Sequence, residues 1–507
     1  MRPPAVAPAP QLLEKGAPLH ATRDAPRLTA PANGEPPRLG RGHWPADAYR
    51  RAELPERVLQ FGTGMLLRAV CAASVDAANR AGRFAGRIVV VQSTPQGQAA
   101  ALNAQDGLFT LLERGFERGE PVERMRLVGA ISRAFVADTQ WDAVRDVVAA
   151  PELQTIVSNV TEAGFRPDAS FPRRLTDLLY TRFERLPDGP PVFVIPTELV
   201  DDNGPRLAAM VDGLVDGLER GPEFRAWLAG RVRFCSSLVD RITTGAPAPD
   251  ERPALERRLG YVDALVTVAE PLCLWAIETD PPVLRAALAI DAAPVVVFAP
   301  DITFYRERKL RLLNGAHTVT APLALLAGVR TVREAVEHPL LGAFLRRVLF
   351  DEIVPATDLP GDAGVAFART VMDRFRNPWL DHEWRVIATN QTAKLRLRVA
   401  PSIVGFTRKR GSAPQGLALG CAAYLHWARS RPGGDVDLPL IERYWRGADS
   451  DPTAALADAG VWGVSLAASP GFREATTRWL LLLERNGVEA ALEALLGAPE
   501  HAASAEA

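Results

Sequence analysis

The sequence predicts an α/β protein, with an N-terminal Rossmann-like dinucleotide-binding domain followed by a mostly α-helical C-terminal domain. Short β-branched runs alternate with helical patterns over the first 300 residues, as in parallel sheets whose strands are joined by helices. The first of these runs ends in a Gly-x-Gly turn, and the pattern beyond residue 300 is almost wholly helical. A chain of 507 residues exceeds the usual size of one hydrophobic core, so we expect two domains.

The first 50 residues differ from the rest in composition. They are rich in Pro, Ala, Gly and Arg and have almost no periodic apolar pattern, which predicts a disordered tail. We place the dinucleotide-binding domain at residues 51–300 and the helical catalytic and substrate domain at residues 301–507.

Composition narrows the class of partner. A net charge of −1 argues against nucleic acid or an anionic membrane as a main partner. The four cysteines lie far apart without a Cys-x-x-Cys pair, which favours neither a zinc cluster nor a disulfide framework and suits the cytoplasm. There is no apolar run of the roughly 20 residues that span a bilayer, and the N-terminus has no secretory signal. The oligomeric state stays open.

The first ordered unit combines a strand, a glycine turn and a helix. Residues 57–61 form an apolar run, Gly62 and Gly64 bracket a tight turn, and residues 65–76 are amphipathic. Such a turn lets backbone N–H groups meet a pyrophosphate at a helix start. Leu67 occupies the usual place of a third glycine, so an ordinary glycine turn is the alternative.

Further strands and helices extend this domain. The strand at residues 87–92 ends without an acid or an arginine that would choose between NAD and NADP. Strands are also expected at 155–158 and 192–195, and helices near 140–150, 172–185 and 205–218. Polar clusters at residues 159–164 and 196–204 follow two strands, where ligands of open α/β sheets bind, and a third lies at 236–242. An ordinary turn at Asn203 and a plain ion pair at Asp240 are the alternative interpretations.

The strongest candidate for chemistry follows a strand at residues 293–298. Lys309, Asn314 and His317 fall on one predicted helix, and at about 100° per residue His317 lies about 80° and Asn314 about 140° from Lys309. An amine, an amide and an imidazole in one cleft can polarise a ketone and protonate it without a metal. Only four lysines occur in the chain, and neighbouring arginines would disfavour the charged form of Lys309. A surface lysine on an Arg-rich helix is the alternative.

Beyond this helix, further helices are expected at 331–350, 363–374, 383–398 and 416–430, with shorter ones to about 495. Three other chemistries are disfavoured. Tyr305-x-x-x-Lys309 matches the Tyr-x-x-x-Lys pair of short-chain dehydrogenases, but in this sequence the pair falls outside the predicted α/β domain. Zinc-ligand spacings and a Gly-x-Ser-x-Gly motif are both missing from the sequence.

These motifs together resemble the mannitol dehydrogenase family of polyol-specific long-chain dehydrogenases, from about residue 54 to the C-terminal helices. The resemblance lies in the following blocks: Gln60-Phe-Gly-Thr-Gly-Met-Leu-Leu-Arg68, Ser158-Asn-Val-Thr-Glu-Ala-Gly164, Pro196-Thr-Glu-Leu-Val-Asp-Asp-Asn-Gly204, Phe234-Cys-Ser-Ser-Leu-Val-Asp-Arg-Ile-Thr-Thr-Gly245, Lys309-x4-Asn314-x2-His317, Arg374-Phe-Arg-Asn-Pro378, His382 and Lys394. The residues of the second, third and fourth blocks favour the branch of the family that acts on uronates.

The resemblance implies a metal-independent, NAD-dependent interconversion of D-tagaturonate and D-altronate. It implies that Lys309 is the general acid/base, while Asn314 and His317 bind the carbonyl oxygen. It further implies that substrate contacts or site positioning come from Asn203, Asp240 and Lys394, and cofactor contacts from Gly62, Gly64, Arg68, Thr161 and Glu162.

Departures from the family leave the carboxylate of the substrate without an assigned cation. The family's glutamate three residues before the lysine is Arg306 here, with Glu307 beside it, and its substrate arginine falls at Val386, next to Arg385. We hypothesise that Arg374 or Arg376 binds the substrate carboxylate, because a guanidinium group can bind a carboxylate bidentately. The alternative is that both arginines only tie helices together. Fructuronate reduction, mannitol or polyol 2-dehydrogenation, and a non-catalytic NAD-binding regulator remain alternative functions.

Overall fold

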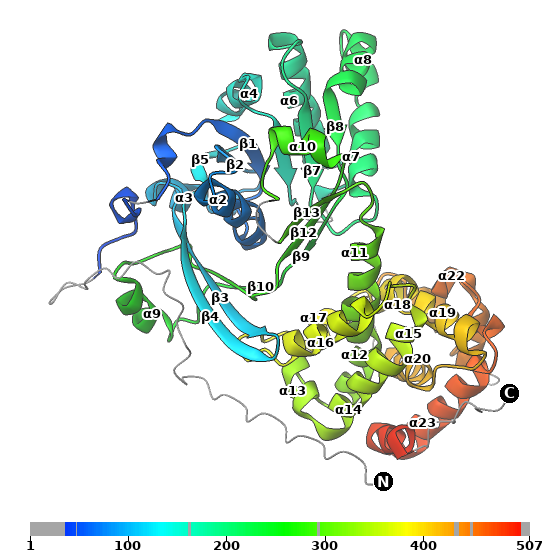
Figure 1. Ribbon diagram of the computed structural model, residues 1–507. Helices are drawn as coiled ribbons and strands as arrows, with labels where there is room; N and C mark the ends of the chain where they lie inside the picture. Colours follow the sequence, from blue (N-terminus) through cyan, green and yellow to red (C-terminus); the bar gives the residue numbers. More distant parts are fainter. Residues whose placement is uncertain are drawn as a thin grey trace.

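The computed structural model describes residues 36–46, 48–160, 164–291, 295–429, 435–446 and 450–497. Within these residues the chain forms two lobes, an upper one built on β-sheets and a lower one built of helices (Figure 1). The predicted fold class, a Rossmann-like domain followed by a helical region, is therefore confirmed.

The upper lobe is centred on a six-stranded parallel sheet with the strand order β5-β2-β1-β6-β7-β8. Its strands are β1 (Glu56–Phe61), β2 (Arg87–Gln92), β5 (Ile131–Val136), β6 (Thr155–Ser158), β7 (Val192–Pro196) and β8 (Val232–Phe234). Phe61 pairs with Val91 on one side and with Ser158 on the other, so β1, β2 and β6 end together. From β1 the strand order proceeds one way to β2 and the other way to β6, and such a switch point creates the crevice in which dinucleotides bind in these sheets.

Helices cover both faces of this sheet because its strands are apolar on both sides. On β1, Val58 contributes to one core, whereas Leu59 and Phe61 contribute to the other. The upper-lobe helices are α1 (Met65–Leu67), η3 (Arg68–Ala72), α2 (Ala73–Arg80), α3 (Ala99–Ala104), α4 (Trp141–Ala149), α6 (Ser170–Arg185), α7 (Asn203–Asp212), α8 (Gly221–Arg231), α9 (Arg252–Leu259) and α10 (Pro281–Ala287).

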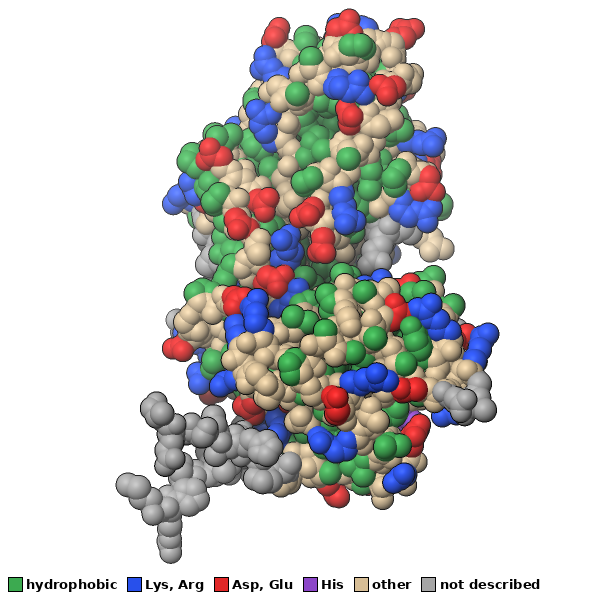
Figure 2. Space-filling model, turned by 90° about the vertical axis from the view of Figure 1, so that its right-hand side faces the viewer, with side chains coloured by type: hydrophobic (Ala, Val, Ile, Leu, Met, Phe, Trp, Pro, Cys, Tyr) green, Lys and Arg blue, Asp and Glu red, His purple; other side chains and the backbone are tan. Residues whose placement is uncertain are grey.

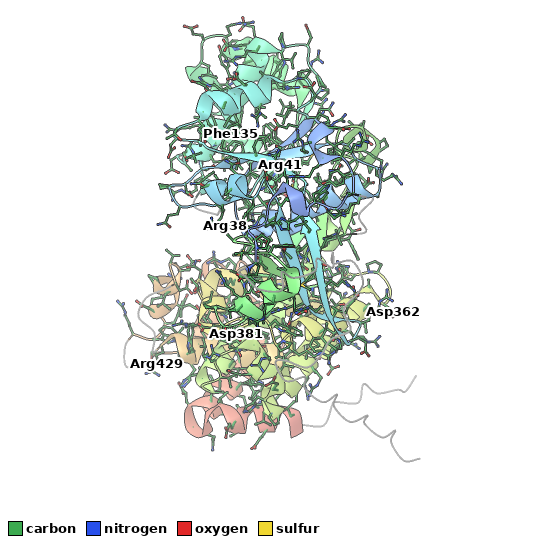
Figure 3. All side chains as sticks on the ribbon, turned by 90° about the vertical axis from the view of Figure 1, so that its left-hand side faces the viewer. Arg38, Arg41, Phe135, Asp362, Asp381 and Arg429 are labelled. Carbon is green, nitrogen blue, oxygen red and sulfur yellow. The ribbon has the colours of Figure 1, made fainter. Side chains whose placement is uncertain are left out.

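Two smaller sheets extend from the upper lobe towards the lower one. One contains β10 (Thr243–Gly245), β11 (Thr267–Ala269), β3 (Phe109–Glu117) and β4 (Glu120–Val128), and the other contains β13 (Val296–Ala299), β12 (Leu274–Glu278) and β9 (Ser237–Asp240). The β3–β4 hairpin reaches down to the lower lobe (Figures 1 and 3). Charged residues interrupt its alternating pattern, and for that reason the sequence did not predict it.

The lower lobe has one continuous core made of residues 312–495. Its main helices are α11 (Thr303–Arg308), η5 (Lys309–Gly315), α12 (Ala316–Leu326), α13 (Val332–Glu337), α14 (Pro339–Arg347), η6 (Val348–Ile353), α15 (Val354–Ala356), α16 (Ala363–Phe375), α17 (Trp384–Ile387), α18 (Gln391–Arg398), α19 (Ala400–Arg410), α20 (Gln415–Ala428), α21 (Leu438–Glu442), α22 (Ala459–Trp462) and α23 (Phe472–Gly497). The helix α19 was not predicted. In the part of the chain that is described, no helix is both long and apolar enough to cross a bilayer.

Part of the predicted disordered tail is ordered. Residues 1–35 lie outside the described residues, but Leu39 is buried and Arg38 forms a β-bridge with Val262. The prediction of disorder is therefore wrong for residues 36–46, because Leu39 joins a small apolar cluster that the tail's polar composition concealed.

Candidate active site

The glycine turn lies at the C-terminal end of β1, in the crevice of the parallel sheet. Gly62 has a φ of +121°, and a Cβ there would stand 3.0 Å from the carbonyl oxygen of Asn159. Glycine meets this constraint without strain. Gly64 precedes α1, and a Cβ on it would project into open space. The turn therefore leaves room for a pyrophosphate at the helix start, which is the chemistry expected of a dinucleotide cradle.

Arg68 stabilises this turn from behind. Its Nη1 donates to the carbonyl oxygen of Thr63 at 2.6 Å, and its Nε donates to the Thr267 hydroxyl at 2.9 Å. Burial lowers the pKa of Arg68 to about 10. The buried Arg68 side chain therefore fixes the backbone of the turn at the carbonyl oxygen of Thr63. Thr161 and Glu162, the other two predicted cofactor residues, lie outside the described residues.

Lys309 begins a π-helical segment, η5, where a regular α-helix was predicted. In a π-helix the hydrogen bonds join residues five apart, and such segments are frequent at functional sites. Lys309 and Asn314 are separated by five residues, which is the spacing of the hydrogen bonds in this segment. The structure thus brings the amine and the amide closer in direction than an α-helix would.

The amine of Lys309 is held at the junction of the two lobes. Its Nζ donates to the carbonyl oxygen of Val239 at 2.6 Å and lies 3.9 Å from Oδ1 of Asp240. Burial lowers the pKa of Lys309; Asp240 opposes this effect, whereas Arg374 and Arg398 add to it. The amine is consequently easier to deprotonate than an exposed lysine.

Asn314 on η5 and His317 on α12 carry polar atoms without partners among the described residues. Within the described residues, neither the buried Nδ2 of Asn314 nor the buried Nε2 of His317 has a hydrogen-bond partner. The His317 ring is stacked on Phe375 at 4.2 Å and meets His382 edge-on at 5.1 Å. Burial holds the pKa of His317 well below its usual value, so the ring is neutral near pH 7. Both nitrogens therefore keep hydrogen-bonding capacity for a ligand.

A buried charge cluster supports Lys309 from the other side. Arg374 donates to both carboxylate oxygens of Asp240 at 2.9 and 3.0 Å and to both of Glu270 at 2.8 and 2.9 Å. Burial would raise the pKa of Asp240, but Arg374 and Lys309 outweigh it and the pKa is lowered. For Glu270 burial prevails and the pKa is raised. Sequence reasoning missed Glu270, whose only signal was an acid at the end of an apolar run.

The remaining predicted residues occupy different places. Asn203 is buried, and its amide bonds the backbone of Ser237, Pro196 and Glu198, so it joins β7 to β9. Lys394 donates to the carbonyl oxygen of Ile387 at 2.7 Å. Both therefore support the backbone around the site through these contacts.

Arg376 lies outside the cluster. Its guanidinium pairs with Asp373 at 2.6 Å, donates to the carbonyl oxygen of Gly119 at 3.2 Å, and covers the ring of Phe116. It thus fastens α16 to the β3–β4 hairpin. Arg385 pairs with Glu383 and is 77% exposed.

Glu198 is a second residue whose role sequence reasoning missed. It is 3% exposed, and its carboxylate accepts hydrogen bonds from the Ser158 hydroxyl at 3.1 Å and from the Val160 backbone at 2.9 Å. It therefore anchors the end of β6, next to the cofactor crevice. Its sequence signal was the acid in the polar cluster that follows β7.

A polar cavity of about 440 Å³ adjoins His317 through His382. Upper-lobe residues Thr243 and Thr244 line one wall, and the lower-lobe segment 378–382 lines the other. Asp381, labelled in Figure 3, marks this segment at the lobe junction. Among the described residues, no three His, Cys, Asp or Glu side chains are grouped for metal binding.

Comparison with known proteins places this geometry among dehydrogenases. Residues 56–291 match the mannitol dehydrogenase Rossmann domain and residues 301–482 match the mannitol dehydrogenase C-terminal domain. An altronate oxidoreductase of Klebsiella pneumoniae is 37% identical over 455 residues, covering 84% of this chain and 94% of that protein. The Bacillus subtilis altronate oxidoreductase is 33% identical, covering 87% and 95%.

Solved structures agree on the fold. A Pseudomonas fluorescens mannitol 2-dehydrogenase, in ternary complex with NAD and D-mannitol, is 25% identical, with a TM-score of 0.70 and coverage of 89% of this chain and 96% of that one. A D-sorbitol dehydrogenase has the same TM-score at 22% identity, with coverage of 88% and 98%.

Proposed function

The chain belongs to the mannitol dehydrogenase family, and from that premise we propose that it is a tagaturonate reductase, or altronate oxidoreductase. The protein is an oxidoreductase that acts on CH–OH groups with NAD. The finer assignment to tagaturonate and altronate is supported by the names and the coverage of the curated relatives. We also propose that the reaction takes place in the cytoplasm.

When bound, NAD would accept a hydride from the carbinol carbon of the alcohol substrate, and NADH would donate one to the ketone carbon in the reverse direction. The residues that would hold it are Gly62 and Gly64 at the end of β1, with Arg68 fixing the carbonyl oxygen of Thr63. Their fit rests on the positive φ of Gly62, which glycine adopts without strain, and on the open space in front of Gly64. The contacts assigned to Thr161 and Glu162 remain part of the proposal.

The observation that supports this chemistry is the pair of buried atoms Asn314 Nδ2 and His317 Nε2, which have no partner among the described residues and belong to the segments η5 and α12 that run on from Lys309. In ketone reduction, negative charge develops on the carbonyl oxygen. Asn314 and neutral His317 donate hydrogen bonds to that oxygen, and stabilisation is largest in a site that excludes water. The Lys309 ammonium then delivers the proton. In the oxidation direction, the neutral amine accepts the proton of the substrate hydroxyl.

The surrounding residues position this set. Asp240 holds the Lys309 amine electrostatically, while Asn203 and Lys394 keep the neighbouring backbone in place. The family's glutamate three residues before the lysine is replaced by Arg306 here. The neighbouring Glu307 pairs with Arg311 at 2.8 Å. Proton exchange with solvent therefore does not pass through an acid at that position.

The test is oxidation of NADH by the purified protein with D-tagaturonate, D-fructuronate and D-fructose side by side, with NADPH as a parallel cofactor. We expect tagaturonate to give the highest kcat/KM. A preference for fructuronate or fructose would move the protein to another branch of the family and contradict the substrate assignment. Tight NADH binding without turnover of any of the three would indicate a regulator.

A further inference from the structure

The proposed substrate carries a carboxylate, and neither predicted cation is available to bind it. Arg374 donates four hydrogen bonds to the carboxylates of Asp240 and Glu270. Arg376 is engaged with Asp373 and the hairpin. The hypothesis that one of them binds the carboxylate therefore has no support in this geometry.

Arg308, the residue before Lys309, differs from these arginines. Its guanidinium carbon lies 4.3 Å from the ring centre of Phe367, and 5.4 and 5.6 Å from those of Phe304 and Tyr305. Across the described part of the chain no acceptor takes a hydrogen bond from this guanidinium, and its Nε is buried. An arginine stacked on aromatic faces keeps its N–H edge available for an acceptor in its plane.

The helix α16 relates Arg308 to His317, because each of them packs on a phenylalanine of this helix. Arg308 packs on Phe367 and His317 packs on Phe375, eight residues further along this helix. At 1.5 Å per residue these contacts are about 12 Å apart. Arg374, which holds Asp240 beside Lys309, lies between them on α16.

A ketouronate of six carbons fits this span. Its carboxylate is four carbon–carbon bonds from the ketone, a reach of about 5 Å with bonds of about 1.5 Å. A hydrogen bond of about 3 Å at each end brings the total to about 11 Å. The reach from the ketone to the carboxylate is therefore compatible with a ketone bound at His317 and a carboxylate bound at Arg308.

We propose that Arg308 binds the carboxylate of the hexuronate and so selects acid sugars over neutral ones; this inference rests on the proposed function. The charge balance of the site agrees with an anionic substrate. The charged groups that act on Lys309 are Asp240, Glu270, Arg374 and Arg398, and Arg308 adds a positive charge that also acts on Asp240. Figure 2 views the molecule from the side of α11, where acidic and basic side chains gather at the narrow junction of the lobes.

The other nearby cations already have protein partners. Arg306 lies 3.3 Å from Asp202, and Arg311 lies 2.8 Å from Glu307. Lys394 donates to the carbonyl oxygen of Ile387, and Arg398 to the Thr318 hydroxyl. Arg308 is thus the cation best placed to gain from an incoming carboxylate.

The experiment compares the variants Arg308→Gln and Arg308→Lys with Arg306→Gln, a matched removal of charge two residues away on the same helix. Steady-state NADH oxidation is measured for each with D-tagaturonate, D-fructuronate and D-fructose, after circular dichroism and NADH binding have verified the fold. For Arg308→Gln we expect about a 100-fold loss of kcat/KM on the uronates, mainly through KM, because a charged hydrogen-bonded pair is lost. Fructose should change less than threefold, and Arg308→Lys should recover part of the loss.

Two results would overturn the inference. One is an equal loss on uronates and fructose, which would mean that Arg308 supports Lys309 or the fold instead of the carboxylate. The other is a uronate-specific loss in Arg306→Gln with none in Arg308→Gln. The unmodified protein reports separately on the proposed function: turnover of fructuronate in place of tagaturonate would refute the proposed substrate, while an Arg308 effect on fructuronate would still support the inference. An unmodified protein that reduces only fructose would refute both.

Discussion

At the scale of single residues, the site depends on burying an amine among compensating charges. An isolated buried ammonium would be strongly disfavoured, yet Lys309 keeps a hydrogen bond to Val239 and an electrostatic contact with Asp240. The amine can therefore exist in both protonation states in the folded protein. A group that alternates between acid and base needs this property.

The pH dependence of turnover follows from the lowered pKa of Lys309. In the proposed mechanism oxidation of altronate requires the neutral amine, so its kcat should rise with pH and level off at a pH below the usual lysine value of about 10.4. Reduction of tagaturonate requires the ammonium and should fall over the same range. Both profiles can be measured by absorbance of NADH at constant ionic strength. Rates that are independent of pH in both directions would exclude Lys309 as the proton-transfer group.

Replacement of the lysine gives a second test at this scale. Lys309→Arg keeps the positive charge but cannot release its proton, so turnover should fall by about 10³-fold or more while NADH binding stays intact. Lys409→Arg is the matched control, because that lysine pairs with Asp358 on the surface at 2.8 Å. Near-normal kcat in Lys309→Arg would remove the residue from the mechanism.

At the scale of elements, the helix α16 connects the site to both lobes. Arg374 reaches Asp240 on β9 and Glu270 after β11, and Asn377 donates to the carbonyl oxygen of Arg114 on β3 at 3.0 Å. The π-helical segment η5 performs the complementary task of aligning Lys309 with Asn314. Side chains five residues apart can act together because the helix is locally wider there.

The buried cluster should be costly to break from the cationic side. Arg374→Met would leave Asp240 and Glu270 facing each other without a partner, and removal of one member of a buried ion pair costs about 3–5 kcal/mol. Arg376→Met removes an arginine two residues away that is 25% exposed, and should cost about 1 kcal/mol or less. Urea unfolding followed by circular dichroism gives both free energies of unfolding. Equal losses in the two variants would contradict the special role of the Asp240–Arg374–Glu270 cluster.

At the scale of the whole molecule, the β3–β4 hairpin fixes the lobes to each other. The backbone N–H of Gly119 donates to Asp373 at 2.9 Å, and Arg376 covers Phe116. In the proposed mechanism Lys309 of one lobe acts against the cofactor crevice of the other, so we expect the hairpin to set the geometry of the reaction.

Gly115 tests this connection. It has a φ of +155°, and a Cβ there would lie 2.7 Å from the Asn377 amide nitrogen and 2.8 Å from Pro271. Gly115→Ala should therefore push the hairpin away from Asn377, with a loss of about 1–3 kcal/mol in the free energy of unfolding and a lower kcat. Gly217→Ala is the control, since nothing lies within 4 Å of its Cβ position. Unchanged stability and kcat in Gly115→Ala would show that the hairpin adapts freely.

The Rossmann-like lobe and the helical lobe could both be predicted from the amino-acid sequence, and the assignment of Lys309, Asn314 and His317 as the chemical centre is a prediction from the same sequence. These features depend on local patterns: buried parallel strands are apolar runs, as at Arg87–Gln92, and a turn that tolerates only glycine is visible in its sequence. The one error about order, at residues 36–46, arose because a single buried Leu39 leaves no periodic signal.

Only the tertiary structure decided what surrounds those residues. The pairing of Arg374 with Asp240 and Glu270 joins residues more than a hundred positions apart, and no local pattern encodes such a contact. The π-helical form of η5 likewise depends on packing against neighbouring helices. Whether an arginine is saturated, like Arg374, or retains unused donors, like Arg308, is a property of the folded neighbourhood, because the side chain is the same in both.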